Sequence, residues 1–148
     1  MYAEKPEETK TAKLLKHFIL FGMGGIAYIV IEMLWRGYSH WSMFMLGGMC
    51  FLVIGFINEQ SRGKLPLLTQ MAIGSASITL LEFLTGYIVN IKLGMNVWSY
   101  YDMPYNIMGQ VCLEYTVMWF FLSAGCIFAD DYLRYRLFGE EKARYRLI

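Results

Sequence analysis

The stretch LLEFLTGY, residues 80–87, places one carboxylate, Glu82, inside an apolar run that extends over residues 67–91. A bilayer-spanning helix needs about 20 mostly apolar residues, and this run is long enough. A carboxylate in such a helix is costly unless it faces protein or water, so it indicates a functional or structural site. This stretch therefore predicts a membrane helix and a candidate site within it.

Three further runs, residues 14–35, 41–57 and 105–129, have the same apolar character. Hydrophobic residues make up 57% of the 148-residue chain, against roughly 45–50% in a soluble domain, and the mean hydropathy is +0.39. A soluble helix bundle is disfavoured, because four such runs leave too little polar surface. The sequence predicts an all-α fold, a four-transmembrane-helix bundle whose transmembrane domain covers residues 14–129.

The two flanking segments differ in character from the spans. Residues 1–13 are polar and predict a cytoplasmic lead-in, and residues 130–148 predict a cytoplasmic, amphipathic helical extension. That extension either continues the fourth span or lies on the inner leaflet. Eleven of the 13 Lys and Arg residues lie before or at the start of the first span, between the second and third, or after the fourth. The positive-inside rule therefore predicts that both termini are cytoplasmic, and a net charge of +1 gives no indication of a nucleic-acid partner.

The third run carries a stripe of polar and small residues. Ser75, Thr79, Glu82, Gly86 and Asn90 are separated by three or four positions, so they share one face of a helix. A polar face on a membrane helix must contact protein or water.

The fourth run repeats this pattern, with Asn106, Gln110 and Glu114 spaced by four. If residues 105–129 are helical throughout, Glu82 and Glu114 both lie about 13 Å below the outer ends of their spans. Such a pair could bind a cation, relay protons or anchor a cationic substrate. The alternative is that each carboxylate is hydrogen-bonded to its neighbours and only stabilises helix packing.

Two further features lie near the predicted outer surface. Glu32 precedes Arg36 by four residues, so the two predict an ion pair on one helix face. The aromatic loop of residues 98–105 contains Trp98 and Tyr101, and Asn106 could cap the fourth helix. The loop either anchors the chain at the interface or covers a cavity above the carboxylates.

No catalytic, metal or cofactor site is predicted. The sequence has no Walker, GxSxG or HExxH motif, and Cys50, Cys112 and Cys126 have neither the number nor the spacing of a disulfide framework or zinc site. An intramembrane enzyme is the least favoured class of function. Residues 31–34 and 81–84 are weakly similar, which suggests two parallel hairpin repeats, although composition alone can produce such matches.

The order of several motifs resembles one known family, the putative ABC-transporter type IV family of small, multi-span bacterial membrane proteins. The motifs are Glu32-x-x-Trp35-Arg36-Gly37, Asn58-Glu59, Gln70-x-x-x-Gly74, Thr79-x-x-Glu82-x-x-x-Gly86 and Trp98-Ser99-Tyr100-x-x-x-Pro104-x-Asn106-x-x-Gly109-Gln110-x-Cys112. Ser99 departs from the family pattern, which often has Asp there. The resemblance implies a transport-related protein of the bacterial cytoplasmic membrane. Since the chain has few spans and no ATP-binding motif, it also implies a homo-oligomer or a partner ATPase.

The leading hypothesis is a small-solute or cation site within the bilayer. Its predicted residues are Glu82, Glu114, Gln110, Thr79, Glu32, Asn106, Trp98 and Tyr101. The alternative is a structural or regulatory membrane subunit whose glutamates stabilise helix packing.

Overall fold

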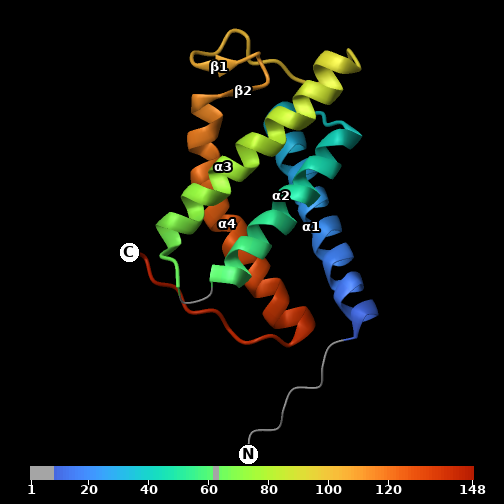
Figure 1. The fold of residues 1–148 in the computed structure, drawn as a ribbon. Coiled ribbons are helices and arrows are strands. Elements are labelled where there is room, and N and C mark those ends of the chain that lie inside the picture. Colours follow the sequence, from blue (N-terminus) through green and yellow to red (C-terminus); the bar gives the residue numbers. More distant parts are fainter. Residues whose placement is uncertain (1–8, 62–63) are drawn as a thin grey trace, which may run out of the picture.

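Four long helices make up most of the chain in the computed structural model, which describes residues 9–61 and 64–148 (Figure 1). They are α1 (Lys10–Arg36), α2 (Trp41–Ser61), α3 (Leu67–Gly86) and α4 (Leu113–Phe138). All four, with α3 counted through Lys92, are long and apolar enough to cross a membrane. The predicted all-α, four-span fold is confirmed.

The helices alternate in direction, so the bundle has two distinct ends (Figure 1). At one end Lys16 near the start of α1 forms an ion pair with Glu140 after α4, with 2.8 Å between Nζ and Oε1. At the other end Gly37 terminates α1 in a left-handed conformation, and Arg36 donates to the carbonyl of Val97. The loop between α3 and α4 therefore covers the end opposite to the C-terminal tail.

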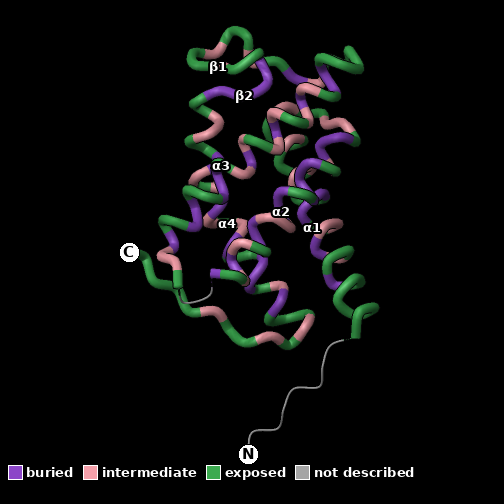
Figure 2. Tube along the Cα trace, viewed as in Figure 1, coloured by how far each residue is buried: buried purple, intermediate pink, exposed green. Residues whose placement is uncertain are grey.

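Helix α2 lies at the centre of the bundle, as the distribution of buried residues shows (Figure 2). More than half of its most apolar window, 56%, is buried, against 17% for α1. The core is built around α2 residues such as Met43, Leu46 and Ile54, with Ile127 and Trp119 of α4. Helix α1 therefore presents most of its apolar surface outward, toward lipid or another chain.

Close contact between α1 and α2 depends on glycines. A Cβ on Gly24 would collide with the Cβ of Phe51 and would lie 3.0 Å from the carbonyl oxygen of Gly47. A Cβ on Gly47 would in turn collide with the Cβ of Tyr28. Small residues let two membrane helices approach closely, so these glycines determine the distance between α1 and α2.

Replacing Gly24 with Ala is therefore expected to lower the free energy of unfolding by about 1–3 kcal/mol, because the added methyl group overpacks this contact. Gly22 in the same helix is the matched control, since a Cβ there has no neighbour within 4 Å. The measurement is denaturant-induced unfolding of both variants in detergent. Equal stability of Gly24→Ala and Gly22→Ala would contradict this account of the packing.

The polar stripe of the third span faces protein, as predicted. Ser75 donates to the carbonyl of Thr116 in α4 over 2.6 Å, and Thr79 donates to the hydroxyl of Thr116 over 3.1 Å. After Gly86 the helix widens into a π-helix, η1 (Tyr87–Lys92), where the buried Asn90 donates to Gln110.

The fourth helix starts later than predicted, and this changes the positions of three candidate residues. Two short antiparallel strands, β1 (Asn106–Ile107) and β2 (Val111–Cys112), replace the first two turns of the predicted helix. Tyr105, Met108 and Gly109 have positive φ angles, which an α-helix does not allow. The segment before Leu113 is therefore a folded loop with two short strands.

Asn106 does not cap α4, contrary to the prediction. Its amide donates to the carbonyl of Met103 over 2.8 Å, and its carbonyl oxygen accepts from the N–H of Gly109 over 3.0 Å. Asn side chains that bond nearby backbone in this way compete with helix formation. The N-cap of α4 is Cys112.

Two other helices are longer than predicted. Thr9 accepts a hydrogen bond from the N–H of Ala12, so α1 begins at Lys10 and not at residue 14. Helix α2 extends to Ser61 and not only to residue 57, because the buried Asn58 is held by Asp131 over 2.9 Å.

The C-terminal extension is helical only as far as Phe138. After Gly139, which has a φ of 63°, the chain runs back without helix to the start of α3 (Figure 1). There the N–H of Leu67 donates to the carbonyl of Arg146 over 2.7 Å, and the N–H of Leu68 donates to the carbonyl of Leu147 over 3.4 Å. Residues 1–8 of the predicted lead-in lie outside the described residues, and the repeat and the domain boundaries stay predictions.

Candidate functional site

A cavity of about 510 Å³ lies at the loop-covered end of the bundle, between the four helices and the loop after η1. Aromatic rings dominate its wall: Tyr28, Trp35, Tyr38, Trp98, Tyr100, Tyr115 and Trp119. Several rings contact one another, with centroids 4.8 Å apart for Tyr100 and Tyr115. The wall therefore presents several π faces to the cavity.

Glu82 is the buried carboxylate of this cavity, with only 2% of its surface exposed. Its Oε1 accepts a hydrogen bond from the Tyr100 hydroxyl over 3.0 Å, and its Oε2 accepts from the indole N–H of Trp119 over 2.9 Å. These two donors come from the loop and from α4, so three elements meet at one side chain. A carboxylate has about four acceptor positions, and two are left for a further donor.

The Tyr100 phenol keeps its proton at this site. Burial raises its pKa well above the ordinary tyrosine value, and the neighbouring Glu82 carboxylate raises it further. Tyr100 therefore acts as a hydrogen-bond donor to Glu82 throughout the physiological pH range.

The predicted pair of Glu32 and Arg36 is confirmed, with 2.6 Å between Oε1 and Nη2. Ser39 donates to the other oxygen of Glu32 over 2.6 Å, and the Arg36 guanidinium lies over the ring of Tyr38 at 4.6 Å. Both charged side chains line the cavity. Arg36 therefore compensates Glu32, and within the described part of the chain no ion pair joins a basic side chain to Glu82.

Acidic residues outnumber basic residues among those that line the cavity. Three of them are acidic, Glu32, Glu82 and Asp102, and Arg36 is the single basic residue among them. A cavity with apolar walls and one sign of charge attracts ligands of the opposite sign. The arrangement favours a cation.

Most of the chain matches one known family. The family model described as putative ABC-transporter type IV matches residues 4–136. The chain belongs to this family. No solved structure matches it.

Family membership and the four apolar helices make this a membrane protein of a transport-related family. Within residues 9–61 and 64–148, no group of three His, Cys, Asp or Glu side chains is placed to hold a metal ion.

Three of the predicted site residues, Glu82, Glu32 and Trp98, line the cavity of this family member. Gln110 and Thr79 do not line it. Gln110 is 2% exposed, accepts from Asn90 over 2.8 Å, and its backbone carbonyl accepts from the indole of Trp98 over 3.0 Å. Gln110 therefore positions the loop.

The other three predicted residues, Glu114, Asn106 and Tyr101, are not part of the cavity wall. Glu114 lies exposed in the first turn of α4. The predicted depth of Glu114, about 13 Å below the outer end of its span, assumed a helix from residue 105, whereas α4 begins at Leu113. Tyr101 is 64% exposed.

Two residues that contact Glu82 were not predicted, Tyr100 and Trp119. Trp119 lies in the middle of an apolar run, away from the membrane interfaces where Trp is common. That position was a usable signal for a polar partner within the bilayer. Tyr100 carried no such signal, because Tyr is typical of an interfacial loop.

Proposed function

We propose that this membrane protein holds a small cationic solute in the aromatic cavity at Glu82, as part of a transport system. The observation that carries the proposal is a buried carboxylate, oriented by Tyr100 and Trp119, in a cavity walled by aromatic rings. Among the residues that the structure describes, no basic side chain forms an ion pair with Glu82, whereas Glu32 is paired with Arg36. A bound cation would supply the missing charge.

The aromatic wall favours an organic ammonium over a bare inorganic ion. Ring faces attract ammonium groups by their quadrupole, and this attraction grows when water is excluded. Small metal ions prefer several oxygen ligands, whereas the wall offers mainly rings. The volume of about 510 Å³ also suits a small organic molecule.

Choline is therefore expected to bind at least tenfold more tightly than dimethylbutanol, its neutral carbon analogue of nearly the same shape, since rings and carboxylate both stabilise the positive charge. Three of the four tryptophans, Trp35, Trp98 and Trp119, line the cavity, so intrinsic fluorescence of the detergent-purified protein reports binding. Equal affinity for the two compounds, or no binding of either, would overturn the proposal of a cation site.

A second function rests on the same two hydrogen bonds. Because Glu82 joins α3 to α4 and to the loop, it could serve only to hold a structural or regulatory membrane subunit together. This alternative predicts a loss of stability, and no loss of binding, when the carboxylate is removed.

We further propose the partners of this protein and its location in the cell. The family name supports pairing with an ATPase, and the exposed apolar side of α1 supports association with a further copy. The excess of Lys and Arg at the end that holds the C-terminal tail supports cytoplasmic termini in a bacterial cytoplasmic membrane. The Glu82 cavity then opens toward the outer side.

A further inference from the structure

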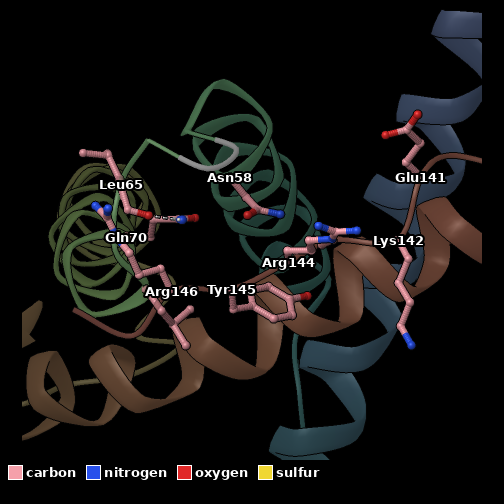
Figure 3. A pocket seen from close by; sticks show the side chains of 10 residues that line it. Asn58, Leu65, Gln70, Glu141, Lys142, Arg144, Tyr145 and Arg146 are labelled. Atoms are coloured by element: carbon pink, nitrogen blue, oxygen red, sulfur yellow. Dashed lines mark hydrogen bonds between the residues drawn. The ribbon is translucent and has the colours of Figure 1, made fainter.

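Figure 3 shows a second hollow, of about 680 Å³. It lies at the opposite end of the bundle from Glu82. The C-terminal tail, residues 139–148, forms one side, and the end of α2 and the start of α3 form the other. Figure 3 shows Gln70 and Arg146 on one side, Glu141 and Lys142 on the other, and Arg144 and Tyr145 between them.

The tail is held in a defined position, so the hollow is a built site. The carbonyls of Arg146 and Leu147 accept hydrogen bonds from the first N–H groups of α3. The Tyr145 hydroxyl donates to Asp131 over 2.7 Å, and the Tyr145 ring packs edge-on against Phe128, with centroids 4.8 Å apart. Backbone bonds and a ring contact thus anchor the segment that carries the basic side chains.

The lining of this hollow is basic. It includes Lys142, Arg144 and Arg146 but only one carboxylate, Glu141. Among the described residues, no hydrogen bond or ion pair joins Lys142 or Arg144 to another side chain, and the Arg146 side chain makes a single long bond of 3.4 Å to the carbonyl of Lys64. These side chains are available to an anion.

Gln70 contributes a buried hydrogen-bond acceptor to the lining of the hollow. Its side chain is nearly fully buried, with 6% exposed, and its Nε2 donates to the carbonyl of Leu65 over 3.1 Å. Its Oε1 is buried and accepts no hydrogen bond from any described residue. A buried acceptor without a donor is unfavourable, so a hydroxyl of a bound ligand would satisfy it.

The hollow also lies where a membrane surface is expected. Helix α3 starts at Leu67, which lines the hollow and begins a membrane span. The last two residues of the tail, Leu147 and Ile148, are apolar and exposed. Basic pockets at the ends of membrane helices are suited to phosphate headgroups, with apolar neighbours contacting acyl chains.

We propose that the hollow between the tail and α3 binds a phosphate ester that carries a hydroxyl group, as in the headgroup of an anionic phospholipid. Lys142 and Arg144 bind the phosphate oxygens, and Gln70 Oε1 accepts a hydrogen bond from the hydroxyl. The proposal is independent of the Glu82 cavity.

The first test measures binding of dioctanoyl phosphatidylglycerol to the full chain in detergent by native mass spectrometry. The double variant Lys142→Gln with Arg144→Gln is expected to bind at least tenfold more weakly, because two charge-assisted contacts are lost. The control is Lys13→Gln with Arg136→Gln, which removes the same charge from exposed positions outside the hollow. An equal loss of lipid affinity in both double variants would mean that the lipid is attracted by the overall positive charge of the protein. This result would overturn the site.

The second test addresses the hydroxyl. Wild-type protein is expected to prefer dioctanoyl phosphatidylglycerol over phosphatidylmethanol by about fivefold, since the latter has the same charge without the hydroxyl. Gln70→Met should bind both lipids equally. An unchanged preference in Gln70→Met would overturn the role of Gln70.

A third arm distinguishes the source of the phosphate. Glycerol 3-phosphate competes for the same basic side chains without acyl chains. If glycerol 3-phosphate displaces the lipid only when its concentration is far above that of the lipid, the result supports a site for a lipid headgroup. Binding of glycerol 3-phosphate as tight as that of the lipid supports the same chemistry with a soluble ligand, and no binding of any phosphate ester overturns the proposal.

Discussion

Glu82→Gln is expected to weaken choline binding by at least tenfold while the protein stays folded. The substitution removes the buried negative charge of the cavity, and truncating or neutralising one partner of a buried charge pair has an effect of this size or larger. The measurement is tryptophan fluorescence titration of the wild type and the variant under identical detergent and salt conditions.

The fold should survive because glutamine can keep both contacts. Its Oε1 can accept from the Trp119 indole, and its amide can donate to the Tyr100 hydroxyl, which then accepts instead of donating. The expected change in the free energy of unfolding is within about 1 kcal/mol.

Glu114→Gln is the matched control for this experiment. It makes the same chemical change at an exposed carboxylate that does not line the cavity. Choline affinity in this variant should be within about twofold of the wild type, in line with the small effects of surface substitutions. A large loss of stability in Glu82→Gln, with choline affinity unchanged, would favour the structural subunit over the cation site.

Arg134→Ala is expected to have the largest effect on stability, lowering the free energy of unfolding by about 3–5 kcal/mol. Arg134 is 1% exposed and forms ion pairs with Asp130, with 2.8 Å between Nε and Oδ2, and with Glu59, with 2.7 Å between Nη1 and Oε1. Removing the guanidinium leaves these carboxylates without their buried counter-charge. The measurement is unfolding in mixed detergent followed by circular dichroism.

Arg136→Ala, two residues further along α4, is the control because Arg136 is exposed. Its stability should change by no more than about 0.5 kcal/mol. If the two variants unfold at the same denaturant concentration, the buried network does not stabilise this end of the bundle.

Buried residues at this end also explain why α2 and α4 are longer than their apolar runs. Asn58 of α2 contacts Asp131 of α4, and Arg134 of α4 contacts Glu59 of α2. The polar last turns of the two helices therefore stabilise each other. A span predicted from hydropathy ends at its last apolar residue, so the prediction underestimates the length of such helices.

The sequence was most informative where the interactions are local or averaged over a long segment. Four apolar runs predicted four membrane helices, because burying backbone in lipid requires helices of about this length. Spacings of three and four predicted the polar face of α3 and the pair of Glu32 with Arg36, since such residues are neighbours on any helix.

Only the tertiary structure decided the partners of Glu82 and the start of α4. Tyr100 and Trp119 are 18 and 37 residues away from Glu82, and no spacing rule relates residues on different helices. The segment before Leu113 was included in the fourth apolar run, yet positive φ angles and the side-chain bonds of Asn106 fold it into a loop. Hydropathy depends on composition alone, whereas the choice between helix and loop, and the rotation of each helix, depends on contacts that form only when the whole chain is packed.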